Sequence, residues 1–216
     1  MPIRFVCLAN SNKEGGRCVA GIKLDKKNKP IIGKLGPKWI RPVCNTEHGE
    51  IPKEYVAHIQ TLDIVEIEID TNQTQGYQSE NVSFDEKSIE VVDRYPITEL
   101  SGLCEDERPK IFGTLGKAIH PDQIHLLHYS LMLIRVDDFT VLEKPHEHKP
   151  GKTQFRLEFH YKRNKYDFVI TDPVFLANYK KNKLYLSEAG TLFLTLSVGV
   201  KYMEWYHKLV AGIILS

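Results

Sequence analysis

Short stretches in which apolar and polar residues alternate recur along this chain and limit what it can fold into. In residues 62–69 the apolar positions are interrupted by Asp63, Glu66 and Glu68, and residues 154–161 repeat the alternation with aromatic side chains. Successive side chains of a β-strand point to opposite faces of a sheet, so this period indicates strands that bury one face. The pattern favours a protein built from strands packed around a core.

Strand-like runs occur throughout the chain, whereas helical segments are few and short. Strands are expected at residues 3–9, 18–24, 39–43, 62–69, 88–95, 130–136, 154–161, 166–170, 192–196, 200–202 and 208–215. Short helices are expected at 96–103, 121–127 and 172–179, the last with Asp172 as its N-cap. Many short strands at regular spacing are typical of barrels or sandwiches, so we expect an all-β fold with a few short helices.

The β-rich sequence falls into two halves separated by a stretch rich in Gly, Pro and Lys near residues 109–117. We therefore expect an N-terminal β-rich domain over residues 1–109, a linker with a short helix over 110–127, and a C-terminal β-rich domain over 128–216. The 216 residues are enough for two small domains of this kind.

The charge of the chain is unevenly distributed, although its net value is only +1. Residues 10–41 carry nine Lys/Arg and two Asp/Glu, and residues 144–165 carry seven Lys/Arg and two Asp/Glu. Residues 63–107, by contrast, carry two Lys/Arg and thirteen Asp/Glu. Such segregation gives a local basic surface without a basic protein, although the same charges could simply solvate long loops. Aromatic residues interleave with the charges of 144–165. This pattern suits a groove that follows a phosphate backbone; the alternative is an ordinary hairpin with an exposed polar face.

Nothing in the sequence indicates export or membrane insertion. No apolar run reaches the ~18 residues needed to cross a bilayer, and the first residues lack the features of a signal peptide. We expect a cytoplasmic protein without membrane contact. The four cysteines are scattered, so we expect reduced thiols, with Cys7 and Cys18 buried in strands.

The loop at residues 10–17 combines amide, hydroxyl and basic side chains with two adjacent glycines. Lys13 and Arg17 can hold a phosphate, and the glycines let the backbone approach an anion closely. Asn10 and Ser11 can hydrogen-bond a base, a sugar or the loop itself. We interpret these four side chains as ligand contacts; the alternative is a β-turn with solvated charges. The sequence is not a P-loop, because its Gly-Lys-Ser/Thr ending is absent.

Two further motifs combine aromatic and polar residues. Trp39 and Arg41 share one strand face and could form a stacking and charge platform for a nucleotide; alternatively, Trp39 is a core anchor and Arg41 pairs with a neighbouring acid. In residues 76–81, Tyr77 could stack on a base. Gln78 and Asn81 could hydrogen-bond the polar edges of a base, and Glu80 could orient an arginine. Alternatively, the motif is a structural loop.

Metal and catalytic motifs are not recognisable. His146 and His148 would share a strand face, but their spacing matches no zincin motif and no cysteine pair completes a site, so we expect no metal and no cofactor. There is no Gly-x-Ser-x-Gly elbow or characteristic carboxylate set, and Asp172 is interpreted as a helix cap. Catalytic groups can assemble in space, so the sequence leaves enzymatic activity undecided.

Six segments of the chain resemble a bacterial family called dual OB domain-containing proteins. They are residues 6–11, 16–21, 39–43, 76–81, 171–173 and 208–211, and they occur in the order of the family across nearly the whole chain. The resemblance implies two OB-like β-barrels packed in tandem. Barrels of this fold typically bind single-stranded nucleic acid or oligosaccharide on one sheet face and its loops.

These observations favour a protein that binds single-stranded DNA or RNA through basic loops and aromatic platforms. A different class remains open, in which the N-terminal polar motifs form the pocket of a nucleotide-binding enzyme or sensor. A third hypothesis is a protein-interaction module of a defence-type complex, whose acidic middle segment meets a basic partner. The oligomeric state cannot be read from the sequence.

Overall fold

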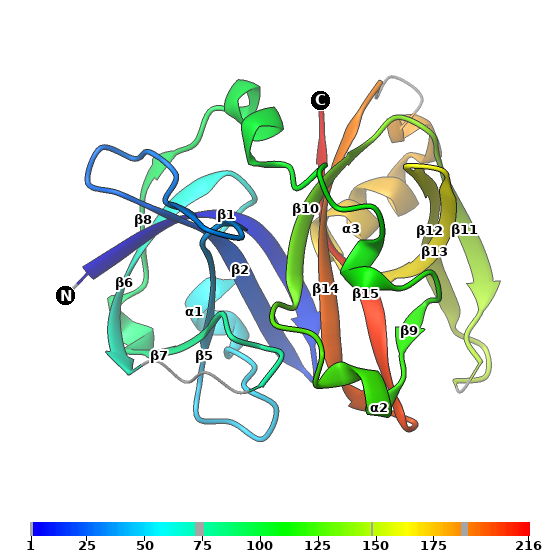
Figure 1. Ribbon diagram of the computed structural model, residues 1–216, viewed down its shortest axis with the longest axis horizontal. Helices are drawn as coiled ribbons and strands as arrows, with labels where there is room; N and C mark the ends of the chain where they lie inside the picture. The colour runs from blue at the N-terminus through cyan, green and yellow to red at the C-terminus, as the bar shows by residue number, and fades with distance from the viewer. Residues whose placement is uncertain (1, 72–75, 148, 187–189) are drawn as a thin grey trace.

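The computed structural model describes residues 2–71, 76–147, 149–186 and 190–216. Its strands form two bodies that lie side by side (Figure 1). The N-terminal half of the chain forms one body, and the C-terminal half forms the other.

The first body is a closed barrel of five strands. Its strands are β1 (Pro2–Lys13), β2 (Gly16–Leu24), β5 (Trp39–Val43), β6 (Asp63–Thr71) and β7 (Asn81–Phe84). They follow the order β1-β2-β5-β7-β6, and β6 pairs with β1 to close the ring. β5 and β7 run parallel, whereas the other neighbours are antiparallel.

Shorter elements surround this barrel. The helix α1 (Lys53–Val56) lies between β5 and β6 in the chain, and β8 (Glu90–Arg94) pairs with β6. The remaining elements are the hairpin of β3 (Ile32–Gly33) and β4 (Gly36–Pro37) and the 3-10 helices η1 (Glu86–Ser88) and η2 (Ile97–Leu103).

The second body is a seven-stranded sheet. Its strands are β9 (Ala118–Ile119), β10 (Leu131–Val136), β11 (Phe139–Pro145), β12 (Thr153–Tyr161), β13 (Asn164–Ile170), β14 (Leu192–Tyr202) and β15 (Trp205–Leu215). Six follow the order β10-β14-β15-β13-β12-β11, and β9 pairs with β15. The helical elements are η3 (Ile111–Gly113), α2 (Pro121–Ile124), α3 (Pro173–Lys181) and η4 (Lys183–Leu186).

The chain itself holds the edges of this second sheet together. β10 and β11 lie at opposite ends of the six-strand path, yet only Asp137 and Asp138 separate them in sequence. Six flat strands would place these edges ~24 Å apart, whereas three peptide steps span at most ~11 Å. The sheet must therefore curl until its edges nearly meet.

Both bodies share one strand order. If β10 and β11 are counted as a single bent first strand, the strands of each body lie in the order first, second, third, fifth, fourth. The fourth strand pairs with the first in both bodies. The third and fifth strands are the parallel pair in both, namely β5 with β7 and β13 with β15. The prediction of an all-β fold with two OB-like barrels is confirmed.

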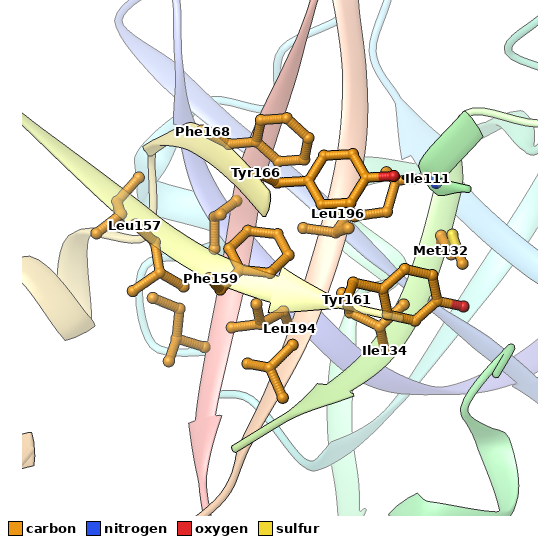
Figure 2. Close-up of a cluster of buried hydrophobic side chains, with 14 of the residues drawn as sticks. Ile111, Met132, Ile134, Leu157, Phe159, Tyr161, Tyr166, Phe168, Leu194 and Leu196 are labelled. Atoms are coloured by element: carbon orange, nitrogen blue, oxygen red, sulfur yellow. Dashed lines mark hydrogen bonds between the residues drawn. The ribbon is translucent and has the colours of Figure 1, made fainter. Parts of the chain in front are cut away.

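Each body has its own apolar core. In the first, alternate residues of β1 and β6 point inward, including Phe5, Cys7 and Val65. In the second, Phe159, Tyr166 and Phe168 form a cluster of ring contacts, with centroids 5.6–5.8 Å apart (Figure 2). Burial of this aromatic surface stabilises the second core together with the aliphatic side chains around it.

A third cluster of buried side chains joins the two barrels. Val6 and Leu8, on the other face of β1, pack with Leu133 and Phe193 of the second barrel, so β1 is buried on both faces. Gly212 has no space for a Cβ, because one would collide with the carbonyl oxygen of Leu8. The barrels therefore contact each other at backbone distance.

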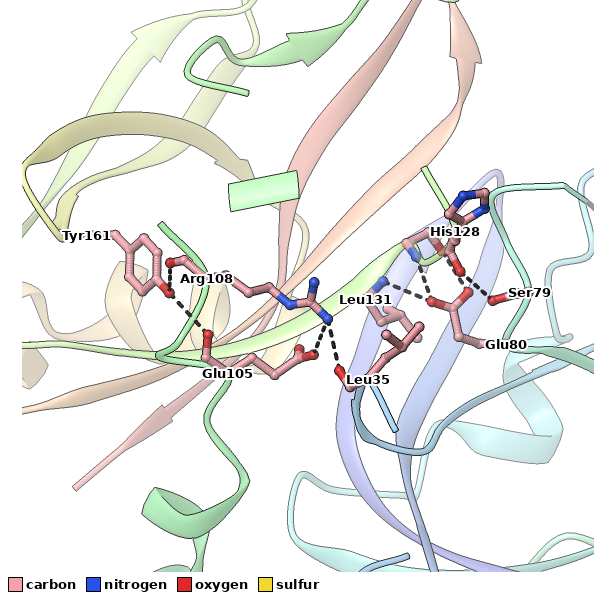
Figure 3. A network of polar contacts seen from close by, with 9 residues as sticks. Leu35, Ser79, Glu80, Glu105, Arg108, His128, Leu131 and Tyr161 are labelled. Carbon is pink, nitrogen blue, oxygen red and sulfur yellow. Dashed lines mark hydrogen bonds and ion pairs between the residues drawn. The ribbon is translucent and has the colours of Figure 1, made fainter. Parts of the chain in front are cut away.

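Polar contacts also cross this junction. Arg108 donates from Nη2 to the carbonyl of Leu35 in the first barrel at 3.1 Å and pairs with Glu105 at 3.2 Å (Figure 3). The hydroxyl of Tyr161, from the second barrel, donates to the carbonyls of Glu105 and Arg108 at 3.2 and 2.8 Å. Burial raises the pKa of the Glu105 carboxyl above its ordinary value, and the neighbouring guanidinium of Arg108 opposes that shift.

The local predictions differ from the structure in a few places. Asp172 caps α3, as its sequence context predicts, by accepting from the amides of Val174 and Phe175 at 3.0 Å. Lys162 and Arg163 form the turn between β12 and β13, and Lys162 has a positive φ of 55°. Cys18 is only half-buried. The domain boundaries at 109–110 and 127–128 stay a prediction.

Candidate functional site

A cleft of about 770 Å³ opens between the two barrels. Its first wall includes the β1–β2 hairpin, Arg41 of β5, His48 of the β5–α1 connection and Gln78 of the β6–β7 connection. Its second wall includes the β14–β15 hairpin, the β11–β12 connection, residues of β12 and β13, and Lys117 directly before β9. In both barrels, therefore, the loop after the first strand and the loop before the fifth strand face the same cleft.

Basic side chains outnumber acidic ones on these walls. The lining includes seven Lys/Arg, namely Lys13, Arg41, Lys117, Lys149, Arg156, Lys201 and Lys208, and two carboxylates, Glu14 and Glu147. It also includes His207, whose pKa is lowered by burial and by the nearby Lys117. A concave surface lined mainly by one sign of charge concentrates its field and attracts ligands of the opposite sign.

Several of these cations already have structural partners. Arg156 is nearly buried and donates from Nε to Asp167 Oδ1 at 2.6 Å. Lys208 is 1% exposed, and its Nζ donates to the carbonyls of Ile111 and Thr114 at 3.0 and 2.8 Å. Burial lowers the pKa of Lys208 to about 7. These groups stabilise the cleft walls more than they offer charge to a ligand.

Other cations remain accessible to a ligand. Lys149 is exposed and Lys13 is half-buried, and neither forms an ion pair with any residue that the structure describes. Lys117 and Lys201 are exposed as well, and they have the carboxylates of Glu147 and Glu204 at 3.9 and 2.7 Å, respectively. Four lysines from both walls can therefore face an anion in the cleft.

The first polar motif lies partly in the cleft and partly in the barrel wall. Ser11 and Lys13 line the cleft. Asn10 is buried, and its Nδ2 donates to the carbonyls of Val56 and Ile59 at 2.7 and 2.9 Å, where it caps the end of α1. Arg17 lies outside the cleft lining and donates to the carbonyl of Asn10 at 3.4 Å.

The second motif is buried at the junction of the barrels. Trp39 is 8% exposed and packs in the core between them, so its ring offers little surface to a ligand. Arg41 is 2% exposed, although it borders the cleft floor. Its Nη2 donates to Ser130 Oγ at 2.8 Å and to Ser197 Oγ at 3.4 Å, both in the second barrel.

The third motif connects the first barrel to the second. Glu80 accepts from the backbone amides of Ser130 and Leu131 at 2.6 and 3.2 Å (Figure 3). Asn81 accepts from Arg41 Nη1 at 3.2 Å. Since Ser130 Oγ also donates to Glu80 at 3.1 Å, the carboxylate orients Arg41 through this hydroxyl.

The aromatic and amide residues of this motif contact the β14–β15 hairpin. The Tyr77 hydroxyl donates to the carbonyl of Gly199 at 2.9 Å, and its ring meets the Tyr206 ring edge-on at 5.2 Å. Gln78 lines the cleft and donates to the carbonyl of Val198 at 3.4 Å. The three motifs thus contribute Ser11, Lys13, Arg41 and Gln78 to one cleft. The ligand-binding role of the ten predicted residues stays a prediction.

The sequence reasoning missed the tip of the β14–β15 hairpin. Tyr202, Met203 and Trp205 line the cleft and are 49%, 57% and 43% exposed. The signal was available as aromatic and basic residues crowded into 201–207, of which the expected strands at 200–202 and 208–215 include only Lys201 and Tyr202. By contrast, Phe159, Tyr161 and Tyr166 of the predicted basic hairpin are buried in the core and offer no platform.

Of the two histidines considered for a metal site from the sequence, His148 lies outside the described residues. Within the described ranges, no group of three or more His, Cys, Asp or Glu side chains is placed to hold a metal ion. The described helices include none that is long and apolar enough to cross a membrane.

The shared strand order and the single parallel pair define both bodies as OB barrels, and the loops that face the cleft are those with which OB folds contact their ligands. The chain matches the family described as the dual OB-containing domain over residues 3–213, and it belongs to that family. No curated protein matches the chain.

Two solved structures are similar over the full length of the chain. One is a murine DNA-binding protein bound to double-stranded DNA, with 9% identity, 100% of this chain and 96% of that chain covered, and a TM-score of 0.39. The other is the tetrameric p202 HIN2, with 8% identity, coverage of 100% and 92%, and a TM-score of 0.31. Scores this low carry no argument about what the present protein binds.

Proposed function

We propose that this protein binds single-stranded nucleic acid in the cleft between its two OB barrels. The observation that carries the proposal is the cleft itself, which is rich in Lys/Arg and faced by the same two loops of each barrel. Nucleic-acid affinity arises mainly from neutralised phosphates, so accessible cations in a continuous groove are the feature that matters most. A cytoplasmic location belongs to the same proposal.

The accessible lysines are the proposed phosphate contacts. Lys13 belongs to the first wall and Lys149, Lys117 and Lys201 to the second, so a strand in the cleft is held from both sides. Gln78 and Ser11 offer hydrogen-bonding groups at the cleft surface. Arg41 lies beneath them as a part of the junction.

The test is fluorescence anisotropy of a labelled single-stranded oligonucleotide over a salt series. Four neutralised phosphates predict affinity about 50-fold weaker at about 200 mM than at about 50 mM salt, from a slope of about −0.7 per contact. The double variant Lys13→Ala/Lys149→Ala should bind more weakly and with a shallower slope. Its control is Lys26→Ala/Lys27→Ala, which removes two exposed lysines outside the cleft and should change little.

Two outcomes would contradict the proposal. One is the absence of binding at low salt, and the other is equal weakening by both double variants, which would indicate attraction to net charge alone.

A second candidate is a small anionic ligand such as a nucleotide, and the size of the cleft favours it. Its volume of about 770 Å³ is in the range of small-molecule sites, which is about 300–1,000 Å³. A mononucleotide that displaces the oligonucleotide at a comparable concentration would support this candidate. Displacement that strengthens steeply with oligonucleotide length would support the strand.

A further inference from the structure

The tip of the β14–β15 hairpin exposes a concentration of aromatic surface. Tyr202 and Trp205 form a cross-strand pair at the last position before the turn. Both are among the large apolar side chains that the fold leaves exposed, at 49% and 43%, and Met203 between them is 57% exposed. Large side chains that no core requires indicate a binding surface when they cluster in a cleft.

The backbone of the tip has an unusual conformation. Met203 and Glu204 both have positive φ, at 44° and 66°. Two-residue hairpin turns of this kind favour Asn-Gly, so a Met-Glu turn is strained locally. An ion pair between Lys201 and Glu204 at 2.7 Å spans the turn. Strained backbone persists where the surrounding structure holds it, and it concentrates at functional sites.

The first barrel holds this hairpin in position. The pairing of β14 with β15 shifts register between Val198 and Lys201, and such a bulge bends a hairpin and re-aims its side chains. The Tyr77 hydroxyl binds the carbonyl of Gly199 inside this irregular stretch, and the Tyr77 ring packs on Tyr206. The direction of the hairpin therefore depends on a contact between the barrels.

The surroundings of the pair favour a charged and aromatic ligand. The Trp205 ring meets the His120 ring at 80° with centroids 5.0 Å apart, which supports the indole from one direction. The exposed lysines Lys117 and Lys201 line the same cleft. A purely apolar partner would remove water from these ammonium groups without offering them hydrogen-bond acceptors, whereas a nucleic-acid strand supplies both aromatic bases and phosphates.

We propose that Tyr202 and Trp205 stack on unpaired nucleobases of a strand whose phosphates follow the cleft lysines. This inference rests on the proposed function and assigns the base-contacting part of its site. Bases in a duplex are covered by their neighbours, so the hairpin selects single strands. Tyr77 acts as a positioning residue for the hairpin.

The test compares two oligonucleotides of equal length, one of thymidines and one of abasic residues, in fluorescence anisotropy at fixed salt. Base stacking contributes about five- to 150-fold in affinity per base, so the thymidine strand should bind more tightly by about this factor. Trp205→Ala and Tyr202→Ala should weaken thymidine binding and leave abasic binding unchanged. Leu35→Ala, an exposed apolar side chain outside the cleft, is the matched control.

The tryptophan fluorescence of the protein gives a second readout. The chain has two tryptophans, of which Trp39 is 8% exposed and Trp205 is 43% exposed. Thymidine strands should quench the emission of the unmodified protein, and Trp205→Phe should abolish that quenching. Abasic strands should not quench.

The outcomes separate this inference from the proposed function. Equal affinity for thymidine and abasic strands, or unchanged quenching in Trp205→Phe, overturns the stacking role while phosphate binding stands. Absence of binding by both strands at low salt overturns both.

Discussion

Glu80 connects the two barrels through buried hydrogen bonds, so its replacement should destabilise the protein strongly. Its carboxylate accepts from the backbone amides of Ser130 and Leu131 and from Ser130 Oγ, at 2.6, 3.2 and 3.1 Å. Glu80→Ala would leave two buried amides without acceptors and would remove the carboxylate that orients Arg41 through Ser130 Oγ. From losses of this kind we expect a cost of about 3–5 kcal/mol in the free energy of unfolding.

Urea unfolding followed by circular dichroism measures this change. Glu80→Gln keeps the size of the side chain and one acceptor oxygen, and it should cost less, about 1–3 kcal/mol. The control is Glu66→Gln, which breaks a partly exposed ion pair with Arg4 at 2.7 Å and should cost at most about 1 kcal/mol. If Glu80→Gln costs no more than Glu66→Gln, the account of the junction is refuted.

Three further predictions concern other groups. Asp172→Ala should cost about 2–4 kcal/mol in the free energy of unfolding measured with urea, because the carboxylate accepts from the amides of Val174, Phe175 and Ile213, each at 3.0 Å. A loss below about 1 kcal/mol would contradict the role of Asp172 as a buried helix cap. Burial lowers the pKa of Lys208 from 10.5 to about 7. Between pH 7 and 10.5 the amine is therefore protonated in the unfolded chain and largely neutral in the folded protein, so stability should rise with pH. The rise in the free energy of unfolding between pH 7 and about 8.5, below the titration of most thiols and tyrosines, is at most about 2 kcal/mol. Lys208→Met should remove this rise, and an undiminished rise would be inconsistent with the buried amine. Each of Lys13→Ala and Lys149→Ala should reduce the salt slope of oligonucleotide binding by about 0.7, and an unchanged slope would place the phosphates elsewhere.

The sequence predicts elements whose cause is local. Alternation predicts β6 and β12 because alternate residues of each strand point into a barrel core, as Ile67 and Leu157 do. Asp172 before a proline predicts the start of α3 because capping involves only neighbouring amides. The two-barrel architecture came from motif resemblance, since strand order depends on pairings that periodicity cannot show.

The site was harder to predict because burial at the junction of the barrels depends on both of them. Trp39 and Arg41 have the residue types of a nucleotide platform, yet contact with the second barrel buries them. Tyr202 and Trp205 have the residue types of strand ends, yet the hairpin extends beyond the core and exposes them. No local pattern distinguishes these two cases.

The central claim is that a single strand lies in the cleft and contacts both barrels. Ultraviolet crosslinking of an oligonucleotide that carries 4-thiothymidine, followed by mass spectrometry of the crosslinked peptides, tests it most directly. The account predicts crosslinks in residues 11–14 of the first barrel and in residues 199–207 of the second. Crosslinks confined to surfaces outside the cleft, such as the β3–β4 hairpin, would contradict it.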